Sequence, residues 1–206
     1  MNASFINRRN FLGTIAAGST LSIAGCTSNG AQTGSADPLE PPVLGNENAQ
    51  ITVDVYEDYK CSRCQTFNQE SFPVIQDELL SAGTIQYRHR DFPVIGTESI
   101  QIANIVRGVQ DRLGNDAFWN VSKTFFDNQG QYSREFWEST IENEGGDAQI
   151  VTDGLNQVWS KTIKTDSTAA KELEVKGTPT VVINGQVVPQ QTQLYAEDII
   201  AYIETI

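Results

Sequence analysis

Residues 51–64 read ITVDVYEDYKCSRC, and this stretch decides the fold because it passes from one periodicity to another. Positions 51–56 alternate and are rich in β-branched side chains, which predicts a strand. After the two cysteines, apolar residues recur at helical spacing as far as Leu80, although Pro73 interrupts the pattern. We therefore expect a strand followed directly by a helix that begins at or beside Cys61.

The next segments predict how this unit continues. Residues 85–90 have the composition of a second strand, and a strand-helix-strand crossover implies that the two strands are parallel. Residues 97–173 carry apolar side chains at helix-like spacing, from which we expect three or four helices. The order of elements favours an α/β fold.

The end of the chain predicts a hairpin and a closing helix. Residues 180–183 are β-branched, and the Asn184-Gly185 dipeptide that follows is a strong hairpin turn signal. Residues 186–188 then return as an antiparallel strand. Residues 196–206 are expected to form the last helix.

The first 25 residues have the features of an export signal. Arg8 and Arg9 precede an uncharged, modestly apolar stretch at 12–25 that is too short to span a bilayer comfortably. The paired arginines resemble the twin-arginine type of signal. The other interpretation is an unstructured N-terminus with chance arginines.

The stretch Ile23-Ala24-Gly25-Cys26 resembles a lipobox, which implies lipid attachment at Cys26 and cleavage just before it. Residues 26–42 are rich in small and polar residues, which predicts a flexible tether. Residues 43–206 remain for one domain, in keeping with a 206-residue chain that is 39% hydrophobic.

The charge balance is acidic, with 14 Lys and Arg residues against 26 Asp and Glu residues. This balance argues against a nucleic-acid partner, because a phosphate backbone would be repelled. The acidic surface is explained either by ordinary solubility or by adaptation to concentrated salt, and we favour the second as a hypothesis.

If Cys26 carries a lipid, Cys61 and Cys64 are the two remaining thiols and can pair only with each other. At a helix N-terminus, free N–H groups and the helix dipole favour a thiolate on the first cysteine. Cys61 is therefore the candidate nucleophile, and Cys64, one turn later, is the candidate resolving thiol. Lys60 and Arg63 could favour the thiolate further or could point into solvent.

Other uses of a CxxC pair can be compared with this one. A structural zinc site needs four ligands, but the chain has no second cysteine pair and His89 is its single histidine. Covalent haem requires a histidine after the second cysteine, and position 65 is Gln. A permanent structural disulfide remains open. His89 itself is expected to be a packed or surface residue rather than a catalytic base.

A second motif, Gly177-Thr178-Pro179-Thr180, lies immediately before the strand predicted at 180–183. A strand, a CxxC pair at a helix start and a Thr-Pro dipeptide before a late hairpin together resemble a thioredoxin fold. The helical segment at about 97–173 resembles the insertion of the DsbA-like branch. The Asp58-Tyr59-Lys60-Cys61 stretch is similar to lipoprotein or membrane-tethered thiol-disulfide oxidoreductases.

The resemblance implies a cis peptide bond before Pro179, next to the cysteine pair, and a Thr178 backbone free to bind an extended substrate strand. The other interpretation is a trans proline that opens a strand. One position departs from the family: many thioredoxin-fold enzymes have a buried acid six residues before the first cysteine, where this chain has Val55. Glu57 and Asp58 are nearby alternatives, and neither is assigned a proton role.

The function implied is an enzyme that forms, reduces or isomerises disulfides in exported proteins, with the Cys61–Cys64 disulfide in place of any cofactor or metal. The implied location is the outer face of the cytoplasmic membrane, with the protein held by lipidated Cys26. The implied partners are exported proteins and a membrane or extracytoplasmic redox protein. The alternative is a non-enzymatic thioredoxin-like lipoprotein that acts as a binding or metal-delivery module.

Overall fold

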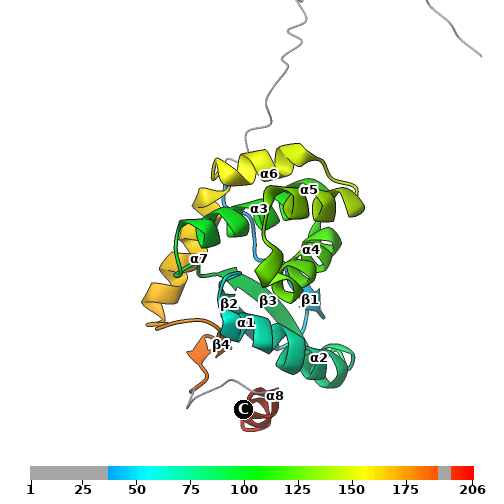
Figure 1. Cartoon of the computed structure of the whole chain (residues 1–206). Helices are drawn as coiled ribbons and strands as arrows, with labels where there is room; N and C mark the ends of the chain where they lie inside the picture. Colours follow the sequence, from blue (N-terminus) through cyan, green and yellow to red (C-terminus); the bar gives the residue numbers. More distant parts are fainter. Residues whose placement is uncertain (1–36, 190–195) are drawn as a thin grey trace, which may run out of the picture. The chain divides into compact units, whose positions relative to one another are not determined.

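The computed structural model describes residues 37–189 and 196–206, so the predicted export signal and Cys26 lie outside the described residues. Helices surround a single sheet in the described part (Figure 1). The strands are β1 (Val43–Gly45), β2 (Ile51–Glu57), β3 (Ile85–Asp91), β4 (Thr180–Ile183) and β5 (Gln186–Val187). The α-helices are α1 (Ser62–Thr66), α2 (Phe72–Ile75), α3 (Thr97–Leu113), α4 (Asn115–Asp127), α5 (Arg134–Asn143), α6 (Ala148–Leu155), α7 (Ser160–Glu172) and α8 (Ala196–Ile203).

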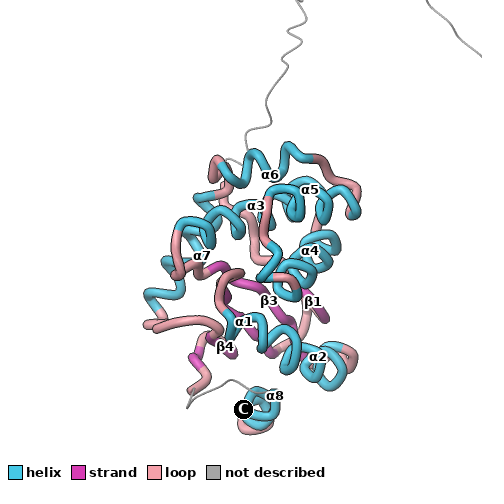
Figure 2. The backbone as a smooth tube through the Cα atoms, viewed as in Figure 1, coloured by secondary structure: helices cyan, strands magenta, loops and turns pink. Residues whose placement is uncertain are grey.

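The sheet has the strand order β1-β3-β2-β4-β5. Figure 2 shows its strands in magenta among the helices in cyan. Strands β2 and β3 are parallel, from Ile51 opposite Ile85 to the end of both strands, which confirms the predicted crossover. β4 is antiparallel to β2, and β5 returns along β4 as the predicted hairpin. β1 is an additional antiparallel edge strand on β3 that was not predicted.

The chain stays helical from Ser62 to Leu80, so the expected interruption at Pro73 was wrong. Two π-helical turns, Phe67–Ser71 and Gln76–Leu80, alternate with α1 and α2. Pro73 lies just after the first of these π-helical turns, inside the continuous helical run. The apolar face of this helical run packs on the sheet together with α8, through residues that include Phe67, Ile75 and Ile199.

Residues 97–173 contain five α-helices, α3 to α7, where three or four were expected. The count differs because local helix stops divide this stretch into shorter helices. Gly145 adopts a positive φ after α5, and the Asp147 side chain then caps a new eight-residue helix, α6. These helices enclose a second core that includes Ile105, Phe118 and Phe125.

The residues that precede β1 contact the helices. The Leu39 N–H donates to Thr162 Oγ1 on α7 at 3.0 Å, and Gln110 of α3 donates to the Glu40 carbonyl at 2.9 Å. Within the described ranges, no helix has both the length and the apolar character that crossing a membrane requires.

Candidate active site

The cysteine pair lies where β2 passes through a short loop into α1. Cys61 is the N-cap residue of α1, with an extended backbone, and Cys64 lies in the first turn of the helix. Both are free thiols in this structure, and the relative exposure is 7% for Cys61 and 0% for Cys64. The first sulfur is thus the one nearer to solvent, and the second is enclosed by the helical core.

The two thiols have opposite pKa shifts. The pKa of Cys61 is lowered to about 5, chiefly because the Cys64 thiol donates a hydrogen bond to its sulfur. Burial opposes this shift, and hydrogen bonds from the Thr178 side chain and from backbone N–H groups at the start of the helix add to it. Burial is the main cause that raises the pKa of Cys64 well above its ordinary value. At neutral pH the arrangement is one thiolate beside one thiol.

The Thr178–Pro179 segment lies against Cys61, although it is distant in sequence. The peptide bond between Thr178 and Pro179 is cis, as the resemblance implied. The Cys61 Sγ atom lies 3.3 Å from the Thr178 carbonyl oxygen. The loop that starts β4 therefore forms one wall of the space around the first sulfur.

Lys60 and Asp58 have contacts that explain the shape of the loop before Cys61. The Lys60 ammonium pairs with Glu98 of α3. Asp58 accepts hydrogen bonds from the backbone N–H groups of Lys60, Val94 and Ile95, at 2.8, 2.8 and 2.9 Å. Because three backbone donors hold its two oxygens, the carboxylate of Asp58 fastens the loop after β3 to the active-site loop.

A cavity of about 350 Å³ adjoins the active site on the side of the Thr-Pro loop. Arg63, the second residue of the pair's spacer, lines this cavity together with Lys176 and Glu174. Its other lining residues are Val175, Gly177, Thr180, Val187, Val188 and Pro189. Among the described residues, no three or more His, Cys, Asp or Glu side chains are placed so that they could hold a metal ion.

Beneath the cysteines lies a buried set of charged residues that the sequence interpretation did not assign. His89 on β3 is fully buried, so the expected packed position is correct, but it lies between two carboxylates. Its Nδ1 atom is 3.2 Å from Glu57 Oε2, and its Nε2 atom is 3.2 Å from Asp91 Oδ1. Although burial acts in the opposite direction, these two contacts raise the pKa of His89 to about 9, which favours the imidazolium.

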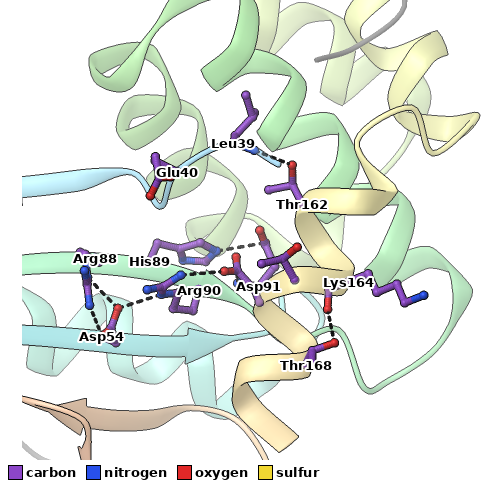
Figure 3. A network of polar contacts seen from close by, with 12 residues as sticks. Leu39, Glu40, Asp54, Arg88, His89, Arg90, Asp91, Thr162, Lys164 and Thr168 are labelled. Atoms are coloured by element: carbon purple, nitrogen blue, oxygen red, sulfur yellow. Dashed lines mark hydrogen bonds and ion pairs between the residues drawn. The ribbon is translucent and has the colours of Figure 1, made fainter. Parts of the chain in front are cut away.

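The charged residues continue across four elements, and Figure 3 shows the part of the network that lies on β2 and β3. Arg107 of α3 donates to Asp91 at 2.5 Å and to Asp166 of α7 at 2.6 Å. Arg90 on β3 bridges Asp166 and Asp54, and Asp54 also binds Arg88. The network therefore links β2, β3, α3 and α7.

A signal for these residues was present in the sequence. Burial alternates along the whole of β3, so His89 and Asp91 share the buried face with Ile85 and Tyr87. A period of two carried through residues 85–91 would have placed both polar side chains inside the protein. An imidazole and a carboxylate on a buried face indicate partners, which here are Glu57 and Arg107.

Comparisons with known proteins agree with this architecture. A family model described as "Thioredoxin" matches residues 38–204. Disulfide bond formation protein D of Bacillus subtilis is 23% identical over 154 residues, which cover 71% of this chain and 69% of the relative. The probable disulfide bond formation protein D of Bacillus cereus is 29% identical over 150 residues, 69% of each chain.

Solved structures give the same picture of the fold. Oxidised BdbD from Bacillus subtilis superposes with a TM-score of 0.73 at 21% identity, covering 84% of this chain and 97% of that one. Chlamydia trachomatis DsbA superposes with a TM-score of 0.66 at 18% identity, covering 80% of this chain and 90% of that one. The sheet with helices inserted between its halves is thus the arrangement found in DsbA-like structures.

Proposed function

Because this chain belongs to the thioredoxin family, as a DsbA-like thiol-disulfide oxidoreductase, we propose that Cys61 and Cys64 are its redox pair and that it acts on exported proteins. The observation that carries the proposal is the position of Cys61. It caps α1, its pKa is lowered to about 5, and its sulfur lies 3.3 Å from the backbone of Thr178. A nucleophilic thiolate beside a surface that can hold a polypeptide is what disulfide exchange requires.

The reaction proceeds through a mixed disulfide at Cys61. A substrate thiolate attacks the Cys61 sulfur of the oxidised enzyme, the bond to Cys64 breaks, and Cys64 leaves with the electron pair. A second substrate thiolate then attacks the substrate sulfur of the mixed disulfide. The substrate leaves as a disulfide, and the enzyme retains two thiols.

We propose that the oxidising direction is the physiological one. A pKa near 5 keeps Cys61 ionised at neutral pH, and a stabilised thiolate favours the dithiol form of the enzyme over its disulfide. An enzyme whose dithiol form is favoured readily gives its disulfide to a substrate. The printed names of the Bacillus relatives, which refer to disulfide bond formation, point in the same direction.

Substrate recognition is assigned to Thr178 and Pro179. Because proline has no N–H group, Pro179 cannot donate a hydrogen bond that would compete with those of a substrate strand. The Thr178 backbone lies next to the reacting sulfur. An extended segment of substrate that hydrogen-bonds to Thr178 would bring its own cysteine to Cys61.

The proposed location is the outer face of the cytoplasmic membrane, with Cys26 as the lipid attachment site. The support is the order of the twin arginines, the uncharged stretch and the lipobox in the first 26 residues. There the enzyme would meet newly exported proteins, and a membrane redox partner would restore its disulfide.

The test is disulfide formation in a reduced, unfolded substrate protein by the full chain carrying Cys26→Ser, which removes the third thiol. We expect refolding well above the uncatalysed rate, with no turnover in Cys61→Ser. Cys64→Ser, with Cys61 first converted to its mixed disulfide with glutathione, should exchange the glutathione for a substrate thiol and then accumulate the Cys61–substrate mixed disulfide, visible on a non-reducing gel. A rate no higher than background would favour a non-enzymatic binding module.

A further inference from the structure

Glu57 ends β2 four residues before Cys61, and its carboxyl is buried, with 3% relative exposure. Asn68, in the helical run after the cysteines, connects it to the second cysteine. The Asn68 Nδ2 atom donates to Glu57 Oε1 at 2.6 Å and to the Cys64 carbonyl at 2.9 Å. One side-chain amide therefore holds the carboxyl of Glu57 close to the residue that carries the buried thiol.

The other oxygen of Glu57 is held by His89, whose second nitrogen faces Asp91. Beyond His89 the charges balance without Glu57, since three aspartates alternate with three arginines: Asp91, Arg107, Asp166, Arg90, Asp54 and Arg88. Each of the three aspartates is paired with an arginine, whereas the buried carboxyl of Glu57 is paired with His89. Unlike a guanidinium, an imidazolium can itself release its proton, so the Glu57–His89 pair can take up and give back a proton.

The charges of Glu57 and the two cysteines affect one another. Burial raises the pKa of Glu57, hydrogen bonds from His89 and Asn68 oppose that rise, and the charge of Cys61 adds to it. Glu57 in turn contributes to the raised pKa of Cys64. A negative charge on Cys64 is therefore less costly once Glu57 has become neutral.

The other titratable groups around Glu57 do not offer a better proton acceptor. Burial raises the pKa of Tyr59 and of Tyr87 well above the ordinary value, so both stay protonated. Asp91 is also buried, but Arg107 beside it lowers its pKa overall, so it stays ionised and paired. Arg107 itself is a permanent cation.

We propose that Glu57 accepts the proton of Cys64 when the mixed disulfide is resolved, and that His89, fixed by Asp91, positions Glu57 for this step. Glu57 then takes the place of the acid that is missing at Val55. The inference rests on the proposed function, because it assigns a step of the same exchange reaction.

With a partner thiol bound to Cys61, the Cys64 thiol gives its proton to the Glu57 carboxylate. The Cys64 thiolate attacks the Cys61 sulfur, the Cys61–Cys64 disulfide forms, and the partner leaves as a thiolate. In the oxidising direction the same path runs backwards, and Glu57 returns the proton to Cys64 as it leaves Cys61.

The test uses an aromatic disulfide, dithiobis(nitrobenzoate), added to the reduced full chain carrying Cys26→Ser. Attack by Cys61 releases one coloured thiolate and leaves a mixed disulfide, and attack by Cys64 releases a second. The two phases of absorbance therefore separate the step at Cys61 from the step assigned to Glu57. Near neutral pH we expect Glu57→Gln to slow the second phase about 10²-fold and to leave the first within about twofold.

Glu70→Gln is the matched control, because Glu70 is an exposed acid of the same helical run, and it should follow the wild type in both phases. His89→Gln tests the positioning role. Since His89 lowers the pKa of Glu57, its removal should move the pH midpoint of the second phase upward. The His89 variant also provides the readout if Glu57→Gln does not fold.

The outcomes separate this inference from the proposed function. A wild-type protein that releases no coloured thiolate, or only one equivalent, would contradict the redox-pair assignment itself. A normal second phase in Glu57→Gln, or an unchanged pH midpoint in His89→Gln, would overturn the role of Glu57 and leave the redox pair intact.

Discussion

Among single residues, Cys61 depends most on its partner in the motif. The Cys64 thiol provides the largest contribution to the lowered pKa of Cys61, which is about 5. Cys64→Ala removes that donor, so we expect the midpoint for thiolate formation to rise by about one pH unit, to a value still below that of a free cysteine. The ultraviolet absorbance of the thiolate, followed against pH, measures the midpoint.

A Cys64→Ser variant is the matched control, since its hydroxyl can still donate a hydrogen bond and its midpoint should lie between the other two. Cys61→Ser should abolish the transition. An identical midpoint in Cys64→Ala and the wild type would mean that the helix start and Thr178 alone stabilise the thiolate.

Sequence reasoning assigned the cysteines from their spacing at the start of a predicted helix, and it assigned Thr178 and Pro179 from the resemblance to the thioredoxin fold. It did not assign Glu57, His89 or Asp91, because a charged residue on a strand is ordinarily solvated. The alternation along β3 could have placed His89 and Asp91 on the buried face, but their charged partners come from other segments: Glu57 of β2 contacts His89, and Arg107 of α3 contacts Asp91. The identity of such distant partners leaves no local pattern in the sequence.

For the secondary-structure elements, close packing between α3 and α6 is the feature most open to test. A methyl group at Gly154 would lie 2.6 Å from the Ile105 Cα atom, so the two helices would have to move apart. Overpacking costs about 1–3 kcal/mol, whereas alanine gains up to about 1 kcal/mol in helix propensity. We expect Gly154→Ala to lower the free energy of unfolding, as measured by urea denaturation.

Gly130→Ala is its control, because a methyl group at that position meets no atom within 4 Å. Its free energy of unfolding should stay within about 0.5 kcal/mol of the wild type. Equal stability of the two variants would show that α3 and α6 separate without cost.

The elements that were predicted correctly have strong local signals. Residues 51–56 alternate, and Asn184 and Gly185 both adopt positive φ at the turn that their identities indicated. β1 was missed because three residues are too few to display a period. The helix count was too low because apolar spacing continues through short breaks, and those breaks depend on a glycine and a cap rather than on a change in periodicity.

For the whole molecule, the formal net charge of −12 gives a prediction about salt. Repulsion among surface carboxylates destabilises the folded chain, and added salt screens that repulsion. We expect the urea midpoint of unfolding to rise as sodium chloride is increased from low to molar concentrations. A midpoint that falls with salt would contradict adaptation to concentrated salt, and the same series in sodium sulfate would separate screening from general salting-out.

The buried network of charges also limits how the enzyme can meet its substrates. Arg107 holds β3 and α7 to α3 through two carboxylates, and parting them would strand charges in an apolar interior at a cost of about 3–5 kcal/mol. The sheet that carries the redox pair and the helices packed on it should therefore keep their relative positions when a substrate binds, rather than close around it. Any adjustment of shape must then come from the substrate, so we expect an unfolded polypeptide to react faster than the same protein in its folded form.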